Sequence, residues 1–203
     1  LNGKRFDKGG YILTYDYDKW SFIDPKEAQK KLNLPRNPRD YTSIAVTTDD
    51  SNDEIVYASS MGDGVIQYKN GTPVQSYNEK NAFKETAGGY GSGYCYIDGL
   101  AFDKNGNLWM TSSEVNHAVL VLDKAGAWHR LDIEQLRGVY TINDILITST
   151  NDKWIYVPRN TPKLVMIPNS ESLDEVSSYE FTTLIDTDGK ELTPSNYTCV
   201  AED

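Results

Sequence analysis

The sequence predicts an all-β fold, a β-propeller built of four-stranded blades, and three observations lead to this prediction. Short segments with alternating apolar and polar residues dominate the 203 residues, and almost none has a sustained helical period. Gly, Asn and Asp separate these segments at hairpin spacing. A unit of about forty residues also recurs, and a repeat too small to bury its own faces is typical of a propeller.

The clearest copy of the repeat begins at Ile97. It contains predicted strands at 99–102, 107–111, 118–122 and 127–131, and its turns at 103–106 and 123–126 both end in glycine. A second copy follows in the same register, because the spacing that matches Leu100 with Ile145 also matches Trp109 with Trp154. Two different positions of the unit therefore support one repeat length.

The repeat organises residues 1–203 as a single propeller segment. We expect a partial blade at 11–22, an insertion at 24–40, blades at approximately 43–77, 97–132 and 142–184, and the start of the next blade at 197–203. In the insertion, Asp24 can cap a helix whose first residue is Pro25, which predicts a short helix ending at Leu32. Both ends fall inside repeats, so we expect a piece of a longer propeller; alternatively, the two end pieces pair into a composite fourth blade.

The charge balance and the cysteine count narrow the function classes. Asp and Glu number 30 against 20 Lys and Arg, a net charge of −10, which disfavours nucleic acid as a partner. No apolar run approaches the ~20 residues of a transmembrane segment. Cys95 and Cys199 are too few for a disulfide framework, which leaves open either two free thiols or one long-range disulfide.

Residues 97–111 (IDGLAFDKNGNLWMT) resemble the two-component-regulator propeller repeat, in the version found in PorZ-like proteins of the type IX secretion system. Residues 182–190, with 194–195 and 197–203, are similar to the segment between blades in that family. The resemblance implies an exported protein, periplasmic or associated with the outer membrane or cell surface. It also implies a non-enzymatic scaffold or binding module whose partner is a protein or a cell-surface polysaccharide or lipopolysaccharide. The alternative within the repeat family is the periplasmic sensor domain of a hybrid two-component system that binds oligosaccharides.

We predict no catalytic residue, no metal site and no cofactor. His117 and His129 are the only histidines, whereas a zinc site needs three or four ligands. The stretch Asp186–Gly189 resembles the middle of a calcium loop, but Leu184 and Ser195 occupy the first and last ligand positions, which predicts a plain turn.

Two groups of residues are candidate ligand contacts. Tyr90 and Tyr94 lie in a glycine-rich insertion, residues 78–94, expected to be a mobile surface loop; their rings suit carbohydrate or peptide recognition, or else pack over a blade edge. Arg36 and Arg39 belong to the one basic stretch, which is either a solvated insertion or a contact for an anionic partner such as a lipopolysaccharide phosphate.

The four tryptophans occupy repeated positions. Trp109 and Trp154 share a place in a predicted second strand, and Trp20 and Trp128 share one in a predicted fourth strand. A bulky residue that recurs at one place of each unit serves packing between blades. We therefore expect all four side chains to be structural.

Overall fold

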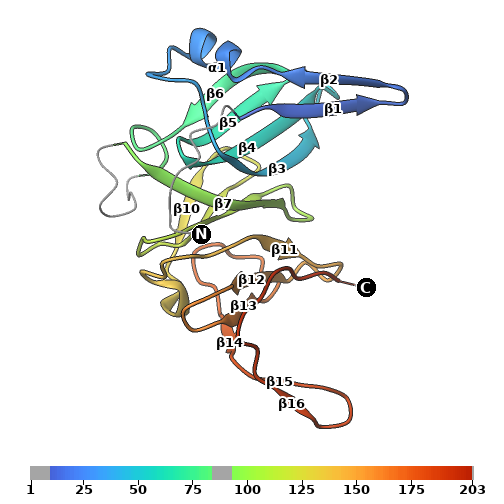
Figure 1. The fold of residues 1–203 in the computed structure, drawn as a ribbon, viewed down its shortest axis with the longest axis vertical. Helices are drawn as coiled ribbons and strands as arrows, with labels where there is room; N and C mark the ends of the chain where they lie inside the picture. The colour runs from blue at the N-terminus through green and yellow to red at the C-terminus, as the bar shows by residue number, and fades with distance from the viewer. Residues whose placement is uncertain (1–9, 84–92, 203) are drawn as a thin grey trace. The chain divides into compact units, whose positions relative to one another are not determined.

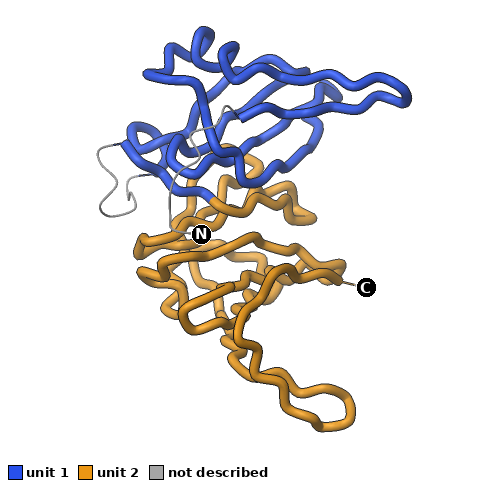
Figure 2. The backbone as a smooth tube through the Cα atoms, viewed as in Figure 1, with its two compact units in different colours: residues 1–97 blue, residues 98–203 orange. Residues whose placement is uncertain are grey.

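The computed structural model describes residues 10–83 and 93–202. The chain divides into two compact units, Leu1–Ile97 and Asp98–Asp203 (Figure 2). Antiparallel strands make up nearly all the regular structure in both units (Figure 1). Within the described ranges, no helix has the length and apolar character needed to cross a membrane.

Unit 1 contains a hairpin, a helix and an antiparallel sheet. The hairpin joins β1 (Ile12–Asp16) to β2 (Lys19–Ile23), and helix α1 (Pro25–Leu32) follows it. The sheet has the order β3–β4–β5–β6, and its strands are β3 (Tyr41–Thr48), β4 (Glu54–Gly62), β5 (Gly64–Lys69) and β6 (Thr72–Tyr77). The first residues of β7 (Cys95–Phe102) pair with the end of β4.

The helix predicted from Pro25 to Leu32 is confirmed, with the expected cap. Asp24 Oδ1 accepts a hydrogen bond from the Lys26 backbone N–H at 2.9 Å, and Asn33 ends the helix in the left-handed region. Ala28 is fully buried in a core cluster of unit 1. The other buried members of that cluster are Ile12, Val56, Ala58, Ile66 and Tyr68. The helix and the base of the hairpin therefore cover apolar residues of β4 and β5.

Unit 2 contains two antiparallel sheets and a small hairpin. The last part of β7 forms the first sheet with β8 (Leu108–Ser112), β9 (Val119–Leu122) and β10 (Trp128–Leu131), in the order β7–β8–β9–β10. The short helix η1 (Glu134–Leu136) follows β10. The second sheet has the order β11–β12–β13–β14, with β11 (Ile145–Ile147), β12 (Lys153–Val157), β13 (Lys163–Ile167) and β14 (Tyr179–Phe181). The hairpin joins β15 (Leu184–Ile185) to β16 (Glu191–Leu192). The predicted all-β propeller segment is confirmed as the fold class.

The core of unit 2 lies between its two sheets. Trp109 and Val121 from the first sheet and Ile155 and Val165 from the second are buried in one cluster. The ammonium of Lys153, itself 1% exposed, lies 4.6 Å from the centre of the Trp109 ring. This packing joins the two sheets of unit 2 into one compact body.

The tryptophans differ in their surroundings despite their shared repeat positions. Trp109 is fully buried, as expected for packing between sheets. Trp154 is only partly buried and stacks on Phe181 of its own sheet, with ring centroids 5.5 Å apart. Trp20 departs from the expectation, because it lies on the hairpin of unit 1 beside Tyr15 and is 68% exposed. A shared repeat position thus does not determine how deeply a tryptophan is buried.

One turn design recurs at four hairpins. Its first residue is Asp49, Asp103, Asp123 or Asp186, and in each case the carboxylate accepts the backbone N–H of the residue four places later, at 2.8–3.0 Å. The fourth residue of each turn has a positive φ, and it is Asn52 in the first turn and glycine in the other three. The turn predicted at Asp186–Gly189 is therefore confirmed.

Lys69 links two carboxylates of the first of these turns. Its Nζ lies 2.7 Å from Asp49 Oδ2 and 2.8 Å from Asp53 Oδ2. The hydrogen bonds from Lys69 hold the pKa of both carboxyl groups below the usual value of Asp. The unfolded chain therefore takes up protons on these groups before the folded chain does, so the stabilisation is present above about pH 4 and is lost as the pH falls below it.

We expect the unfolding temperature to be lower at about pH 3 than at about pH 6. In the variant Lys69→Met, this decrease in unfolding temperature should be smaller. In that variant both carboxyl groups lose the ammonium that lowers their pKa. Thermal unfolding at the two pH values measures the difference, with Lys190→Met as the control because Lys190 is exposed on a turn of the other unit. An equal fall in wild type and Lys69→Met would contradict the assignment.

Candidate functional site

The structure brings Arg36 and Arg39 together around one carboxylate. Arg36 Nε donates to Asp63 Oδ1 at 2.7 Å, and the Arg39 backbone N–H donates to Asp63 Oδ2 at 3.2 Å. The Arg39 guanidinium also lies 3.8 Å from Asp63 Oδ2. Asp63 therefore already offsets one of the two positive charges that an anionic ligand would use. A role for the two arginines in ligand binding stays a prediction.

The two candidate tyrosines do not form a described binding surface. Tyr90 lies outside the described residues. Tyr94 is 3% exposed and contacts Tyr96 edge to face, with ring centroids 6.3 Å apart. A ring buried in this way cannot stack on a ligand from solvent, which corrects the expectation that Tyr94 lies in an accessible loop.

The two cysteines are free. Cys95 is buried beside β4, and burial raises the pKa of its thiol to about 12. Cys199 is exposed. The alternative of one disulfide is therefore excluded in this structure. A thiol that stays protonated at neutral pH is also a poor nucleophile, so Cys95 fits a packing role.

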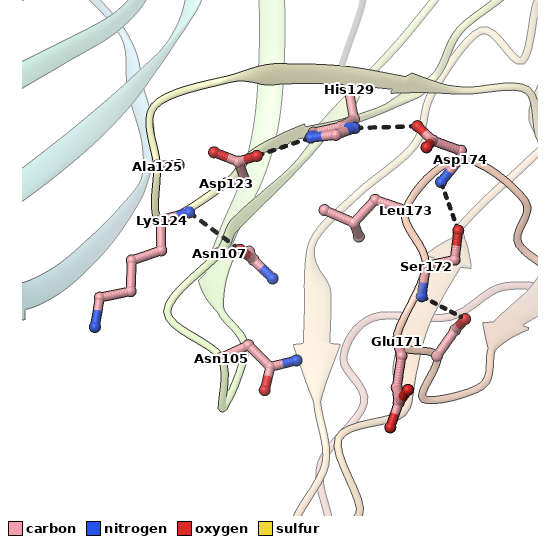
Figure 3. A pocket seen from close by; sticks show the side chains of 11 residues that line it. Asn105, Asn107, Asp123, Lys124, Ala125, His129, Glu171, Ser172, Leu173 and Asp174 are labelled. Carbon is pink, nitrogen blue, oxygen red and sulfur yellow. Dashed lines mark hydrogen bonds and ion pairs between the residues drawn. The ribbon is translucent and has the colours of Figure 1, made fainter.

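A cleft of about 630 Å³ in unit 2 is a candidate site, and we name it the unit 2 cleft. Figure 3 shows its two walls. One wall consists of the turn residues Asn105, Asn107, Asp123, Lys124 and Ala125 together with His129 of β10, and the other consists of Ser170, Glu171, Ser172, Leu173 and Asp174. The second wall belongs to the segment between β13 and β14. The amide groups of Asn105 and Asn107 and the side chain of Leu173 point into the space between the walls.

The recurrent turns hold the first wall in place. In the turn that begins at Asp103, the carboxylate accepts the backbone N–H of Asn105 and of Asn107 at 2.9 Å each. Asn107 then accepts the Lys124 backbone N–H at 3.1 Å, which joins this turn to the next one. The wall is thus preorganised by hydrogen bonds that involve no ligand.

His129 lies between two carboxylates at one end of the cleft. Its Nε2 is 3.0 Å from Asp123 Oδ2, and its Nδ1 is 3.5 Å from Asp174 Oδ1. The hydrogen bond from His129, together with the Ala127 backbone N–H, lowers the pKa of Asp123. Asp123 is therefore an anion at neutral pH and orients the imidazole ring.

The cleft can bind polar groups, and its histidine is poorly placed to act as a general base. Amide, carboxylate and hydroxyl side chains offer donors and acceptors at several points. A general base must hold a free lone pair within hydrogen-bond distance of the group that it deprotonates, whereas both ring nitrogens of His129 face carboxylates. In the described parts of the chain, no group of three or more His, Cys, Asp or Glu side chains could hold a metal ion.

Sequence reasoning did not find this cleft. Its first wall carried a usable signal, because the turns 103–106 and 123–126 repeat the Asp-Lys-x-Gly pattern. Its second wall carried none, since residues 170–174 have no regular pattern and are brought to His129 only by the folding of the second sheet. The sequence marked His129 only as an isolated histidine.

No protein-family model and no curated protein sequence matches the chain. Among solved structures, the chain is similar to PorZ, a bacterial surface component of the type IX secretion system of Porphyromonas gingivalis. The TM-score is 0.83 at 19% sequence identity, and the match covers 97% of this chain and 27% of PorZ.

Extracellular domains of two hybrid two-component systems from B. thetaiotaomicron match less well, with TM-scores of 0.46 and 0.43 and identities of 14% and 16%. These two matches cover 70% and 72% of this chain, and 19% of each domain.

The resemblance first seen in residues 97–111 is thereby confirmed at the level of the fold. The structural match extends over nearly the whole chain. At 19% identity the match shows the fold alone. This chain has the PorZ-like propeller fold.

Proposed function

We propose that this chain is a binding module of an exported, non-enzymatic propeller protein at the bacterial surface, and that the unit 2 cleft receives a segment of a partner protein. The fold supports the first part, because its structural neighbour PorZ is a surface component of a secretion system. The observation that carries the second part is a cleft whose polar wall is already held in place by the recurrent turns.

The chemistry of the cleft favours a protein segment over a glycan. Sugar rings are commonly held against the faces of tryptophan, tyrosine or phenylalanine rings, and the described lining of this cleft contains none of these three residue types. It contains Asp123, Glu171 and Asp174 against one lysine. A peptide with a lysine or arginine and a free backbone amide would complement these acceptors.

Site-specific crosslinking in the full-length protein tests the proposal. A photoreactive amino acid replaces Asn105 in the cleft, and in a control protein it replaces Glu191, which is exposed on β16 outside the cleft. We expect a defined protein adduct from position 105 and none from position 191. Adding Glu171→Lys places a like charge opposite a basic partner and is expected to reduce the adduct at least about tenfold.

Binding of purified lipopolysaccharide and of neutral oligosaccharides to the full-length protein, measured by calorimetry, provides the second arm. Glycan binding that Glu171→Lys abolishes, without a protein adduct, would overturn the choice of a protein partner and favour the sensor or glycan-attachment alternative. If neither a protein adduct from position 105 nor glycan binding is observed without the Glu171→Lys change, the unit 2 cleft is not the binding site.

A further inference from the structure

His129 joins two parts of unit 2 that are separate in the sequence. Asp123 lies at the start of the turn before β10, and Asp174 lies in the irregular segment between β13 and β14. The side chains of His129 and Asp123 are 23% and 21% exposed, whereas that of Asp174 is 88% exposed. The imidazole therefore contacts the mostly buried Asp123 through one nitrogen and the exposed Asp174 through the other (Figure 3).

Both contacts are favourable only when the imidazole is protonated. A neutral imidazole has one N–H donor and one lone pair, and an ionised carboxylate can only accept. With two carboxylates facing the two nitrogens, the neutral ring would direct its lone pair at one of them. The imidazolium, which donates from both nitrogens, satisfies the two contacts together.

Loss of the proton should release Asp174 rather than Asp123. The Asp123 contact is shorter, and Asp123 is fixed in its turn because its Oδ1 accepts the Ala127 backbone N–H at 2.8 Å. At Asp174 the structure shows a hydrogen bond from the backbone N–H to Ser172 Oγ at 3.2 Å, while the carboxylate side chain is 88% exposed. The neutral ring can therefore keep its one N–H on Asp123 while the Asp174 contact is lost.

The segment around Asp174 is anchored by hydrogen bonds at both ends, and its partly buried Leu173 and the following Val176 also pack against the core cluster of unit 2. The Asn169 backbone N–H donates to Asp152 Oδ1 at 2.8 Å, and Ser178 Oγ donates to Gln135 Oε1 at 2.9 Å. Between them, residues 170–174 form one wall of the unit 2 cleft, and residues 170–175 contain no strand or helix. We name residues 170–175 the latch segment.

We propose that His129 is a pH-dependent latch: protonated, it holds the latch segment against β10, and neutral, it releases that segment and so changes one wall of the unit 2 cleft. The other charged groups of the cleft are Lys124 on the β9–β10 turn and Glu171 on the latch segment itself. Neither has a contact with the ring. The inference concerns the conformation of the cleft and holds whatever the cleft binds.

Hydrogen exchange in the full-length protein, followed by mass spectrometry, tests the latch. Exchange of peptides that cover the latch segment is compared at about pH 5.5 and about pH 8, the range in which histidine changes charge, after correction for intrinsic exchange. We expect protection in wild type to be roughly two- to fivefold higher at the lower pH, as for an exposed ion pair. Peptides from β12 and β13 should show no such change.

Two variants separate the latch from a general effect of charge. Asp174→Asn removes the carboxylate that faces His129 and should give the low protection of the released segment at both pH values. Glu171→Gln makes the same change of charge in the same segment without touching the ring, and should keep the wild-type response. Equal protection at both pH values in wild type would overturn the proposal, as would a response that Glu171→Gln abolishes and Asp174→Asn preserves.

Discussion

Replacement of Trp109 by alanine is expected to lower the free energy of unfolding of this protein by about 3–5 kcal/mol, the cost typical of removing a buried tryptophan. Trp109 is 1% exposed and lies between the two sheets of unit 2. The alanine variant would leave a cavity among β-strands that cannot collapse without breaking their pairing. It would also remove the ring that faces the buried ammonium of Lys153.

The loss of the ring contact with Lys153 adds to the destabilisation expected for Trp109→Ala. Burial already lowers the pKa of Lys153, so the folded state holds this ammonium at a cost in free energy. The Trp109 ring provides part of the compensation, and Asp103 adds to it through its charge. We therefore expect the loss in Trp109→Ala to shrink in the double variant with Lys153→Met, since no ammonium is then left without the ring.

Two further variants separate the causes of the stability lost in Trp109→Ala. Trp109→Phe keeps an aromatic ring but removes the hydrogen bond from Nε1 to Asp103 Oδ2, which is 2.9 Å long, and should cost about 1–3 kcal/mol. Trp154→Ala removes the tryptophan of the same repeat position from a half-exposed place and should cost less than Trp109→Ala. Chemical denaturation of each variant gives the comparison. An equal loss at positions 109 and 154 would contradict our account of the core.

Replacement of Gly64 by alanine is expected to lower the free energy of unfolding by about 2–5 kcal/mol, for a reason of backbone geometry. Gly64 begins β5 with a φ of +78°. A Cβ at this position would lie 2.1 Å from the Tyr77 carbonyl oxygen, a backbone atom of the neighbouring strand β6. The strand cannot move away without disturbing its pairing with β5.

Gly126→Ala is the matched control for this prediction. Gly126 also has a positive φ, +90°, but a Cβ there would meet no atom within 4 Å. This variant should therefore show only the cost of the left-handed backbone, roughly 1–2 kcal/mol. Thermal or chemical unfolding of both variants separates steric overlap from backbone strain. A Gly126→Ala variant as unstable as Gly64→Ala would mean that the contact with Tyr77 is unimportant.

The fold class could be predicted from sequence because its determinants are local. Alternation of apolar and polar residues selects strands, and residues such as Gly106 and Gly126 permit the positive φ of the turns between them. Asp24 and Pro25 likewise specified the start of α1. The repeat then indicated that the strands group in fours, since a single unit cannot bury its own faces.

The surroundings of the candidate ligand contacts could not be predicted from local sequence in the same way. Tyr94 follows a glycine-rich stretch, which favours an exposed position, yet its side chain is buried and contacts Tyr96 edge to face. Arg36 and Arg39 stand in a basic stretch, yet Asp63, distant in sequence, occupies them both. For the two arginines, a contact from a remote part of the chain outweighed the local pattern.

Strands, turns, the helix cap and the PorZ-like repeat thus follow from the order of residues, because neighbouring residues decide backbone conformation. Tertiary structure decided which side chains meet: Lys153 with Trp109, Asp63 with the two arginines, and His129 with Asp123 and Asp174. Such contacts depend on how sheets and loops pack, and packing fixes distances that no sequence spacing contains. The unit 2 cleft exists for this reason, as its two walls come from segments joined only by the fold.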